Sequence, residues 1–371
     1  MRVYPVLAMA LFACSPDTSN PDSSNPDPSK GGTTTADVAA STPIADDGKP
    51  PQPGELKTFA DWTVGCDNVR RCQANALMPE AAMSDGYLMM VITRDAGPDA
   101  PMRGTVPFSG KAPARLALAV DGESIGTLSP RPDGSSATLT LNRARASQLA
   151  NGSRVMLSTA SGAAIDSASL KGLAAALLYI DDRQQRVGTT SAMQRPGSAV
   201  SPAAPSVPTI AVPATAPAKP RVLSVAAATK LIGRDNAVCD YAVVDVTVES
   251  YRLDATHSLA LVSHPCGNGA YNMFSSAFIV DEEGKAVPAQ FDWATGMGSE
   301  EGDQSLVNAG WDDDSRRLST YAKGRGIGDC GSSSQFAWDG LRFRLTDLHA
   351  MGECRGSTNF IRLWTRATRP R

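Results

Sequence analysis

The chain has 371 residues, 42% of them hydrophobic, and a formal net charge of −3 at pH 7. This length and apolar content are enough for two domains that each bury a core. The slightly acidic charge argues against a nucleic acid or an anionic membrane surface as partner.

The first fourteen residues have the pattern of an export leader that ends in a lipobox. Arg2 and an apolar run precede Leu11-Phe12-Ala13-Cys14. In bacterial lipoproteins the cysteine at this edge is acylated and becomes the first mature residue. We therefore expect a lipoprotein signal over residues 1–14 and lipidation of Cys14. Because Ser15 follows, rather than an aspartate, the expected location is the outer membrane, facing the periplasm or the surface.

The alternative is an ordinary signal peptide cut after Ala10 or Ala13. No other stretch approaches the ~20 apolar residues of a membrane helix. Contact with the membrane is therefore expected through the lipid anchor.

Two low-complexity segments divide the rest of the chain. Residues 15–54 are rich in Pro, Ser, Asp and Thr without any aromatic residue, which predicts a disordered tether. Such a tether would span roughly 35 Å r.m.s.. Residues 191–221 are rich in Pro and Ala and predict a semi-stiff linker. Two modules remain, at residues 55–190 and 222–369.

The first module is predicted to be β-rich with two helices. Strands are predicted at residues 59–64, 87–93, 115–120 and 154–158. Asp121-Gly122 is a hairpin signal. Asn142 is expected to cap a short helix that Gly152 ends, and residues 170–185 have the strongest helical pattern.

The second module opens with a predicted helix at residues 224–232 and continues as strands. These are predicted at residues 246–253, 258–262, 276–280, 306–311, 318–321, 335–338, 341–345 and 359–365. Short strands separated by turn residues at close spacing favour antiparallel pairing over βαβ units. We predict a mainly β protein of two antiparallel β-sandwich or barrel-like modules, each with one or two short helices.

Seven cysteines are present, and six remain when the lipidated Cys14 is set aside. An even number in an exported protein predicts three disulfides. The favoured pairs are Cys66–Cys72, Cys239–Cys266 and Cys330–Cys354. The first closes a short loop, whereas the connectivity within the second module stays open. No spacing of Cys and His residues matches a metal site, so neither a metal nor a cofactor is predicted.

Three motif matches are interpreted as coincidences. Gly122-Glu-Ser124-Ile-Gly126 has the spacing of a nucleophile elbow but lies in a predicted hairpin. Gly326-Ile-Gly328-Asp-Cys-Gly331 has dinucleotide-binding spacing, but no helix is predicted after it. Asp312-Asp313-Asp314 lacks the later glycine and glutamate of a calcium loop and indicates a solvated turn.

The densest group of polar residues surrounds Cys330 and Cys354. A bond between these cysteines would hold their α-carbons within ~7 Å, so the flanking charges are expected to converge. The candidate ligand-binding residues are Tyr271, Asn272, Lys323, Arg325, Asp329, Glu353 and Arg355. One interpretation is a site for an anionic or sugar-like ligand, or a carboxylate pair for hydrolysis. The other, which we favour, is a salt-bridge network that holds loops together.

Several runs of residues resemble one family. They are Phe59-x-Asp-Trp62-x-Val-x-Cys66-Asp-Asn68 with Cys72, Ser169-Leu170-Lys-Gly172 with Asp181-Asp182-Arg-Gln-Gln-Arg186, Cys266-Gly-Asn-Gly-Ala270-Tyr271-Asn272, Lys323-Gly-Arg325-Gly-Ile-Gly-Asp329-Cys330-Gly, Trp338-Asp-Gly340 and Met351-Gly-Glu-Cys354-Arg-Gly356. Over residues 57–367 the chain resembles the exported proteobacterial domain-of-unknown-function family numbered eleven seventy-six. The front half is also similar to invasion-associated-locus-B proteins, although the second cysteine pair common in those proteins is missing here. The resemblance implies an exported envelope protein and no particular activity.

These patterns predict a lipid-anchored envelope protein with a binding or interaction role. The expected partners are the membrane, through the anchor, and an envelope protein or peptidoglycan. No residue is assigned a catalytic role. The alternatives are an envelope hydrolase that uses Asp329 and Glu353, and an inhibitor of a foreign hydrolase presented on the tether.

Overall fold

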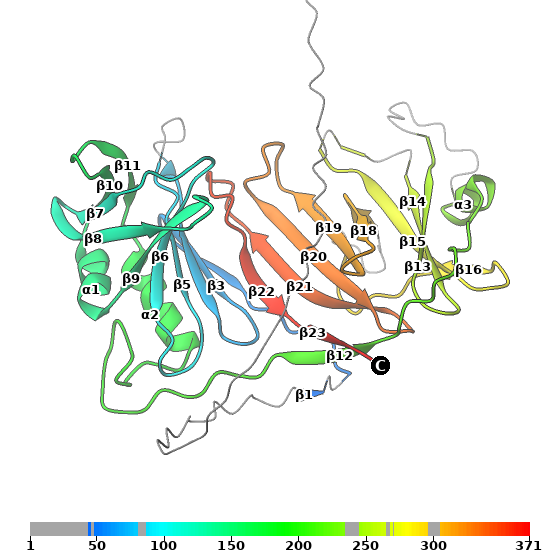
Figure 1. The fold of residues 1–371 in the computed structure, drawn as a ribbon, viewed down its shortest axis with the longest axis horizontal. Coiled ribbons are helices and arrows are strands. Elements are labelled where there is room, and N and C mark those ends of the chain that lie inside the picture. The colour runs from blue at the N-terminus through cyan, green and yellow to red at the C-terminus, as the bar shows by residue number, and fades with distance from the viewer. Residues whose placement is uncertain are drawn as a thin grey trace, which may run out of the picture. The chain divides into compact units, whose positions relative to one another are not determined.

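The part of the chain that the computed structural model describes is built mainly from antiparallel β-sheets (Figure 1). It comprises residues 44–45, 48–80, 87–233, 245–264, 268–269, 271–295 and 305–371. All of these belong to one unit, Thr42–Arg371. The predicted signal, Cys14 and most of the predicted tether lie outside the described residues.

A ten-stranded sheet, here called the N-terminal sheet, has the order β11-β10-β7-β8-β9-β6-β5-β4-β3-β2. Its strands are β2 Leu56–Phe59, β3 Trp62–Cys66, β4 Cys72–Ala76, β5 Val91–Arg94, β6 Met102–Pro107, β7 Leu116–Val120, β8 Glu123–Pro130, β9 Ser136–Leu141, β10 Arg154–Thr159 and β11 Ala164–Ser169. Strand β8 pairs with β7 along most of its length and with β9 only through Ser129 and Pro130. Side chains from both ends of this sheet, among them Trp62 and Val155, share one buried core.

Two helices complete this core. Helix α1, Arg143–Asn151, begins at Asn142, whose side-chain oxygen accepts a hydrogen bond from the backbone N–H of Arg145, and ends at Gly152. Helix α2, Leu173–Arg183, packs on β3 and buries Leu173, Leu177 and Ile180. Both helices were predicted, and both predictions are confirmed.

Two five-stranded sheets, here called the C-terminal sheets, enclose a second core. One contains β13 Val248–Arg252, β14 Ser258–Ser263, β15 Phe274–Val280, β16 Ala286–Pro288 and β17 Leu306–Val307. The other contains β18 Gly310–Asp312, β19 Arg317–Lys323, β20 Gly331–Trp338, β21 Phe343–Met351 and β22 Ile361–Thr365. Helix α3, Val225–Leu231, is capped by Ser224 and joins a smaller cluster with β14 and β15. These sandwich-like antiparallel sheets confirm the predicted fold class.

A small parallel sheet brings together three distant segments. Strand β12, Pro208–Val212, lies within the predicted linker and pairs with β1, Ile44–Ala45, on one side. On the other side it pairs with β23, Ala367–Pro370, near the end of the chain. The linker is therefore extended, as predicted, but it is also held by backbone hydrogen bonds. The domain boundaries at residues 55–190 and 222–369 stay a prediction.

Two predicted strands are interrupted in the structure. Residues 59–64 form a hairpin of β2 and β3, because Ala60 adopts a left-handed conformation with φ 52°. Residues 306–311 are divided between β17 and β18 at Asn308, which has φ 45°. Neither turn has the Gly or Pro that usually marks one in sequence.

The structure confirms two of the three predicted disulfides. Cys66 bonds to Cys72 across paired positions of β3 and β4. Cys330, which directly precedes β20, bonds to Cys354, with 4.8 Å between their α-carbons. Cys239 and Cys266 lie outside the described residues. None of the described helices is long and apolar enough to cross a membrane.

The C-terminal edge of the chain packs on the hairpin of β3 and β4, where β22 lies beside β3 (Figure 1). The side chain of Asn68 accepts a hydrogen bond from the backbone N–H of Thr365 (2.8 Å) and donates one to its carbonyl (3.0 Å). Arg362 forms an ion pair with Asp67 at 2.7 Å. We call this contact region the junction.

The side chain of Arg355, in the loop between β21 and β22, extends the junction with three contacts. Its guanidinium donates to the carbonyl of Met78 (2.7 Å), the carbonyl of Ala60 (2.8 Å) and a carboxylate oxygen of Asp61 (2.6 Å). A planar guanidinium with several donors suits such a site better than an ammonium group.

We therefore predict that Arg355→Ala lowers the free energy of unfolding by about 3–5 kcal/mol, because it leaves a largely buried carboxylate and two carbonyls unpaired. Urea denaturation measures this change. Arg131→Ala is the matched control, since its ion pair with Asp133 is exposed and its removal should leave stability near wild type. Equal denaturation midpoints for the two variants would contradict the structural role given to Arg355.

Candidate functional site

The predicted polar cluster is built around the loop between β19 and β20, residues 324–330, here called the glycine loop. Its ends are paired through the N–H of Gly324 and the carbonyl of Cys330 at 2.9 Å. Inside it, the N–H of Gly328 donates to the carbonyl of Arg325, and the hydroxyl of Tyr321 donates to the carbonyl of Gly328, both at 2.9 Å. The backbone of the loop is thus fixed from both sides.

An ion pair closes the loop from within. The Nε of Arg325 donates to Asp329 at 2.6 Å, and a second guanidinium nitrogen bonds to the other carboxylate oxygen. That second oxygen also accepts from the backbone N–H of Gly356 at 2.8 Å. The hydrogen bond from Arg325 lowers the pKa of Asp329, and the same contact raises the pKa of Arg325. The Cys330–Cys354 disulfide makes a second connection to the same segment.

The tip of the loop displays an apolar side chain beside an aromatic ring. Ile327 is 74% exposed, and the neighbouring Tyr271 is 58% exposed. The ring of Tyr271 lies directly on Gly326, where a Cβ would come within 2.6 Å of the ring carbons. A glycine at this position is therefore what lets the aromatic ring approach the loop.

Two asparagine side chains hold the Tyr271 segment against β19. Asn272 donates to the carbonyl of Lys323 (3.0 Å) and accepts from its N–H (3.1 Å), in the manner of a paired strand. Asn308 donates to the carbonyl of Tyr321 at 2.7 Å and to the side-chain oxygen of Asn272 at 3.0 Å. Asn272 was predicted as a ligand contact but is used here for bracing, and Asn308 was not predicted at all.

The remaining predicted residues point elsewhere. Glu353 accepts a hydrogen bond from the hydroxyl of Thr58 at 2.8 Å, and Arg355 belongs to the junction. The ammonium of Lys323 lies 5.9 Å from the centre of the Tyr321 ring. The structure brings Arg325 and Asp329 together and turns Glu353 and Arg355 toward the N-terminal sheet.

This geometry does not favour a carboxylate pair for hydrolysis. A glycosidase needs one carboxyl group whose pKa is raised so that it can donate a proton. Asp329 is only 2% exposed, its oxygens accept from Arg325 and Gly356, and its pKa is lowered. Asp329 therefore serves as a brace of the glycine loop.

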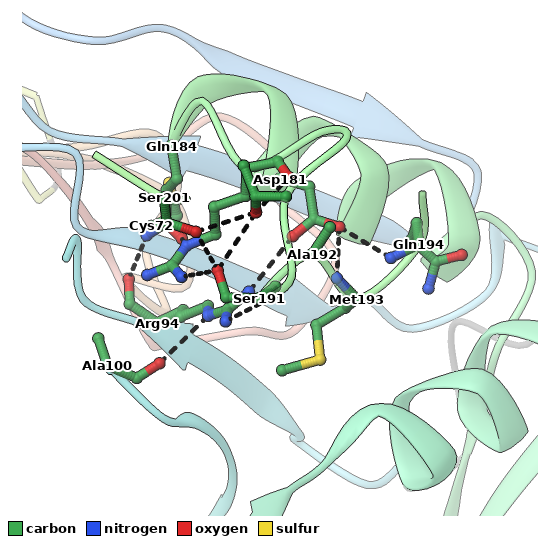
Figure 2. Close-up of polar contacts among 12 residues, drawn as sticks. Cys72, Arg94, Ala100, Asp181, Gln184, Ser191, Ala192, Met193, Gln194 and Ser201 are labelled. Carbon is green, nitrogen blue, oxygen red and sulfur yellow. Dashed lines mark hydrogen bonds and ion pairs between the residues drawn. The ribbon is translucent and has the colours of Figure 1, made fainter. Parts of the chain in front are cut away.

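A second polar cluster lies between helix α2 and strand β5 of the N-terminal sheet. Figure 2 shows Asp181, on α2, accepting from Arg94 (3.3 Å) and from the backbone N–H groups of Met193 (2.7 Å) and Gln194 (2.8 Å). Burial raises the pKa of Asp181 and, as the largest cause, lowers that of Arg94 to about 10.

Gln184 and Arg186 extend this network. Gln184 donates to the carbonyls of Arg70 (2.8 Å) and Arg94 (2.9 Å), and accepts from Arg186 at 2.9 Å. All of these side chains but Arg70 are buried. The cluster fixes the chain that follows α2, and its side chains bond to one another and to the backbone.

In the described ranges, no three His, Cys, Asp or Glu side chains are grouped so that they could hold a metal ion. The candidate site that the predicted residues form is the glycine loop, a braced element with Ile327 exposed at its tip.

We predict that Asp329→Asn lowers the free energy of unfolding by about 1–3 kcal/mol at pH 7, because an amide nitrogen would face the buried N–H of Gly356 or the guanidinium. The folded-state pKa of Asp329 is below the unfolded value near ~3.9, so its stabilisation is complete above that pH. The difference between wild type and Asp329→Asn should therefore shrink as pH falls through about 4.

Urea denaturation at a series of pH values measures this difference. Asp314→Asn, in the exposed turn between β18 and β19, is the control and should change neither stability nor its pH dependence. A variant as stable as wild type at pH 7 would show that the ion pair does not brace the loop.

Comparison with known proteins assigns the sequence to a family. The chain is 30% identical over 325 residues to "Uncharacterized protein YpfG" of Escherichia coli strain K12, covering 80% of this chain and 88% of that protein. The crystal structure of invasion associated protein B from Bartonella henselae is similar to 35% of this chain and 99% of its own, with 15% identity and a TM-score of 0.28. Residues 56–371 match the sequence profile described as "Protein of unknown function (DUF1176)", and the chain belongs to that family.

Proposed function

We propose that this protein is an exported, lipid-anchored envelope protein that binds another envelope protein through its glycine loop. The observation that carries the proposal is the exposure of Ile327, 74%, on a loop whose backbone is held at both ends and in the middle. Rigid loops that display an apolar side chain are well suited to recognition, because little ordering is needed when a partner binds.

The energetic advantage of such a loop is substantial. Ordering one flexible backbone residue costs ~1–2 kcal/mol, and the glycine loop has already lost that freedom on folding. Burying an isoleucine side chain contributes roughly 1.5–3 kcal/mol. Most of the gain from covering Ile327 would therefore appear as affinity.

The chemistry of the loop favours a protein partner over peptidoglycan. Ile327 and Tyr271 present an apolar and an aromatic surface, and the charge of Arg325 is neutralised by Asp329. The many hydroxyl, amide and carboxylate groups of peptidoglycan need polar partners, whereas an isoleucine tip fits an apolar pocket of a folded protein.

Inhibition of a foreign hydrolase is a narrower form of the same proposal. A braced loop with a protruding side chain can enter a concave active site without reorganising. The conformation of the glycine loop supports this version, and it would make the bound partner an enzyme.

Two observations support the proposed location. The Cys66–Cys72 and Cys330–Cys354 disulfides are stable in an oxidising compartment outside the cytoplasm. The sequence Leu11-Phe12-Ala13-Cys14 supplies a lipidation site, and the tether after it would give the loop a reach of roughly 35 Å.

We predict that a photoreactive residue placed at position 327 crosslinks to one discrete protein in intact cells, because the tip of the loop would lie in that partner's pocket. Ile327→Asp should weaken recovery of the same partner at least tenfold, since a carboxylate cannot enter an apolar pocket without a large desolvation penalty. Immunoblotting and mass spectrometry of the crosslinked species measure both effects.

Val222 provides the matched control, because it is 75% exposed and is not part of the loop. The same photoreactive residue at position 222 should give no such species, and Val222→Asp should leave recovery unchanged. Crosslinks to peptidoglycan alone, or identical products from both positions, would reject a protein partner for the loop.

We also predict that Cys14→Ser blocks lipid attachment and moves the protein from the membrane fraction to the soluble periplasmic fraction, or leaves it as precursor. Cell fractionation and mass spectrometry of the mature N-terminus measure this. Globomycin should cause precursor of the wild-type protein to accumulate. A wild-type protein that is processed after Ala10 or Ala13 and carries no lipid would contradict the anchor.

A further inference from the structure

A pocket of about 410 Å³ opens between the two C-terminal sheets and is separate in sequence from the glycine loop. Its walls are largely apolar, with Ile279, Val287, Pro288, Trp338 and Leu341 among the lining residues. Leu341, at 76% exposed, is one of the most exposed large apolar side chains of the described chain. The pocket can therefore receive an apolar group from solvent.

His257 also lines this pocket, in a fixed orientation. Its Nδ1 lies 3.0 Å and 3.1 Å from the two carboxylate oxygens of Asp254. One of these oxygens accepts from the indole N–H of Trp338 at 2.6 Å, and the other from the backbone N–H groups of Thr256 and His257 at 2.9 Å each. The carboxylate is buried and holds the imidazole by its inner nitrogen.

These contacts determine where the imidazole proton lies. Burial raises the pKa of Asp254, but the hydrogen bonds from Thr256, Trp338 and His257 outweigh it and hold the pKa below its ordinary value. The Thr256 hydroxyl lies 3.1 Å from Nδ1 but donates its hydrogen to Asp254 at 3.2 Å. Asp254 is therefore an acceptor, and the hydrogen shared with His257 is carried by Nδ1. In the neutral imidazole, Nε2 then bears a lone pair and acts as a hydrogen-bond acceptor.

From this geometry we infer that the pocket binds a neutral, mainly apolar ring that carries one hydroxyl group, and that His257 accepts the hydroxyl hydrogen through Nε2. The apolar walls would cover the ring, while the Asp254–Trp338 pair fixes the acceptor. Lys285 and Asp281 also line the pocket, and the backbone N–H of Lys285 donates to Asp281 at 2.7 Å. With one charge of each sign, these two residues favour a ligand without net charge.

This inference is independent of the partner proposed for the glycine loop, because the two sites share no residue. It also gives a role to the Trp338-Asp-Gly340 run, whose tryptophan supplies the N–H that orients Asp254. His257 is a binding residue in this inference, and no reaction is assigned to it.

Two probes of nearly equal shape test the hydroxyl contact. p-Cresol has the donor, whereas 4-methylanisole replaces it with a methoxy group. Isothermal titration calorimetry with the intact protein should give a dissociation constant for p-cresol about tenfold lower than for 4-methylanisole. In His257→Phe the two constants should become equal, while Asp254 keeps its bonds from Trp338 and the backbone.

Leu341→Ser separates the apolar wall from the hydrogen bond. It should weaken both probes by a similar factor and leave the ratio between them unchanged. Because this side chain is exposed, the variant should fold normally. It keeps the test decisive even if His257→Phe is unstable.

A measurement that needs no variant examines the imidazole directly. Long-range ¹H–¹⁵N spectra, recorded at a pH at which the imidazole is neutral, should show a protonated Nδ1 and a bare Nε2 on His257, and p-cresol should shift the Nε2 signal. Equal affinity for the two probes, absence of binding by either one, or the opposite tautomer would each overturn the inference.

Discussion

Burial of the β3–β4 hairpin on both faces is the constraint on which the rest of the structure depends. Every residue of β3 and of β4 is buried. One face packs under α2, and β22 contacts both strands. A sheet covered on both faces cannot be displaced on one side without exposing apolar surface there. The hairpin is therefore the place where the N-terminal sheet and the C-terminal sheets become one structure.

The buried carboxylate of Asp67, at the end of the hairpin, is paired with Arg362 of β22. Burial raises the pKa of Asp67, and the opposing effect of Arg362 limits that rise. The pair is not a reason for high stability in itself, since an ion pair of this kind repays its desolvation only in part. Its consequence is specificity, because the backbone N–H groups of Val69 and Arg71 bond only one oxygen of Asp67, and any other arrangement of β22 would leave the second oxygen without Arg362.

The glycine loop inherits its rigidity from this junction. The segment that follows β21 carries Arg355, which bonds to the N-terminal sheet, and Gly356, whose N–H bonds to Asp329. The Cys330–Cys354 disulfide packs in a small apolar cluster with Leu77. The next residue, Met78, donates its backbone N–H to the carbonyl of Arg355. Loss of the junction would therefore also loosen the loop, so binding defects in Arg355 variants must be compared at equal stability.

Elements with strong local signals were predictable from the sequence, whereas a strand whose buried polar side chains have distant partners was not. Helix α1 was located because Asn142 caps it and Gly152 ends it, which are local effects. Strand β4 was missed because Gln73 and Asn75 break the apolar pattern. Both are buried and donate to the carbonyl of Asn359, almost 300 residues later. The candidate site follows the same pattern. The contact between Arg325 and Asp329 was predictable because they lie only four positions apart in the sequence.

The partners of Glu353 and Arg355 show why closeness to a disulfide is a weak guide to a binding site. A disulfide fixes α-carbons, but each side chain then takes the best partner within its reach. For Arg355 that partner is a set of acceptors on the N-terminal sheet, and for Glu353 it is Thr58. Among the described residues, Ile327 and Leu341 are large apolar side chains that are mostly exposed, and each belongs to one of the two proposed sites. Both proposals therefore rely on shape and apolar contact, whereas the buried ion pairs of Arg355 and Arg362 hold the framework in place.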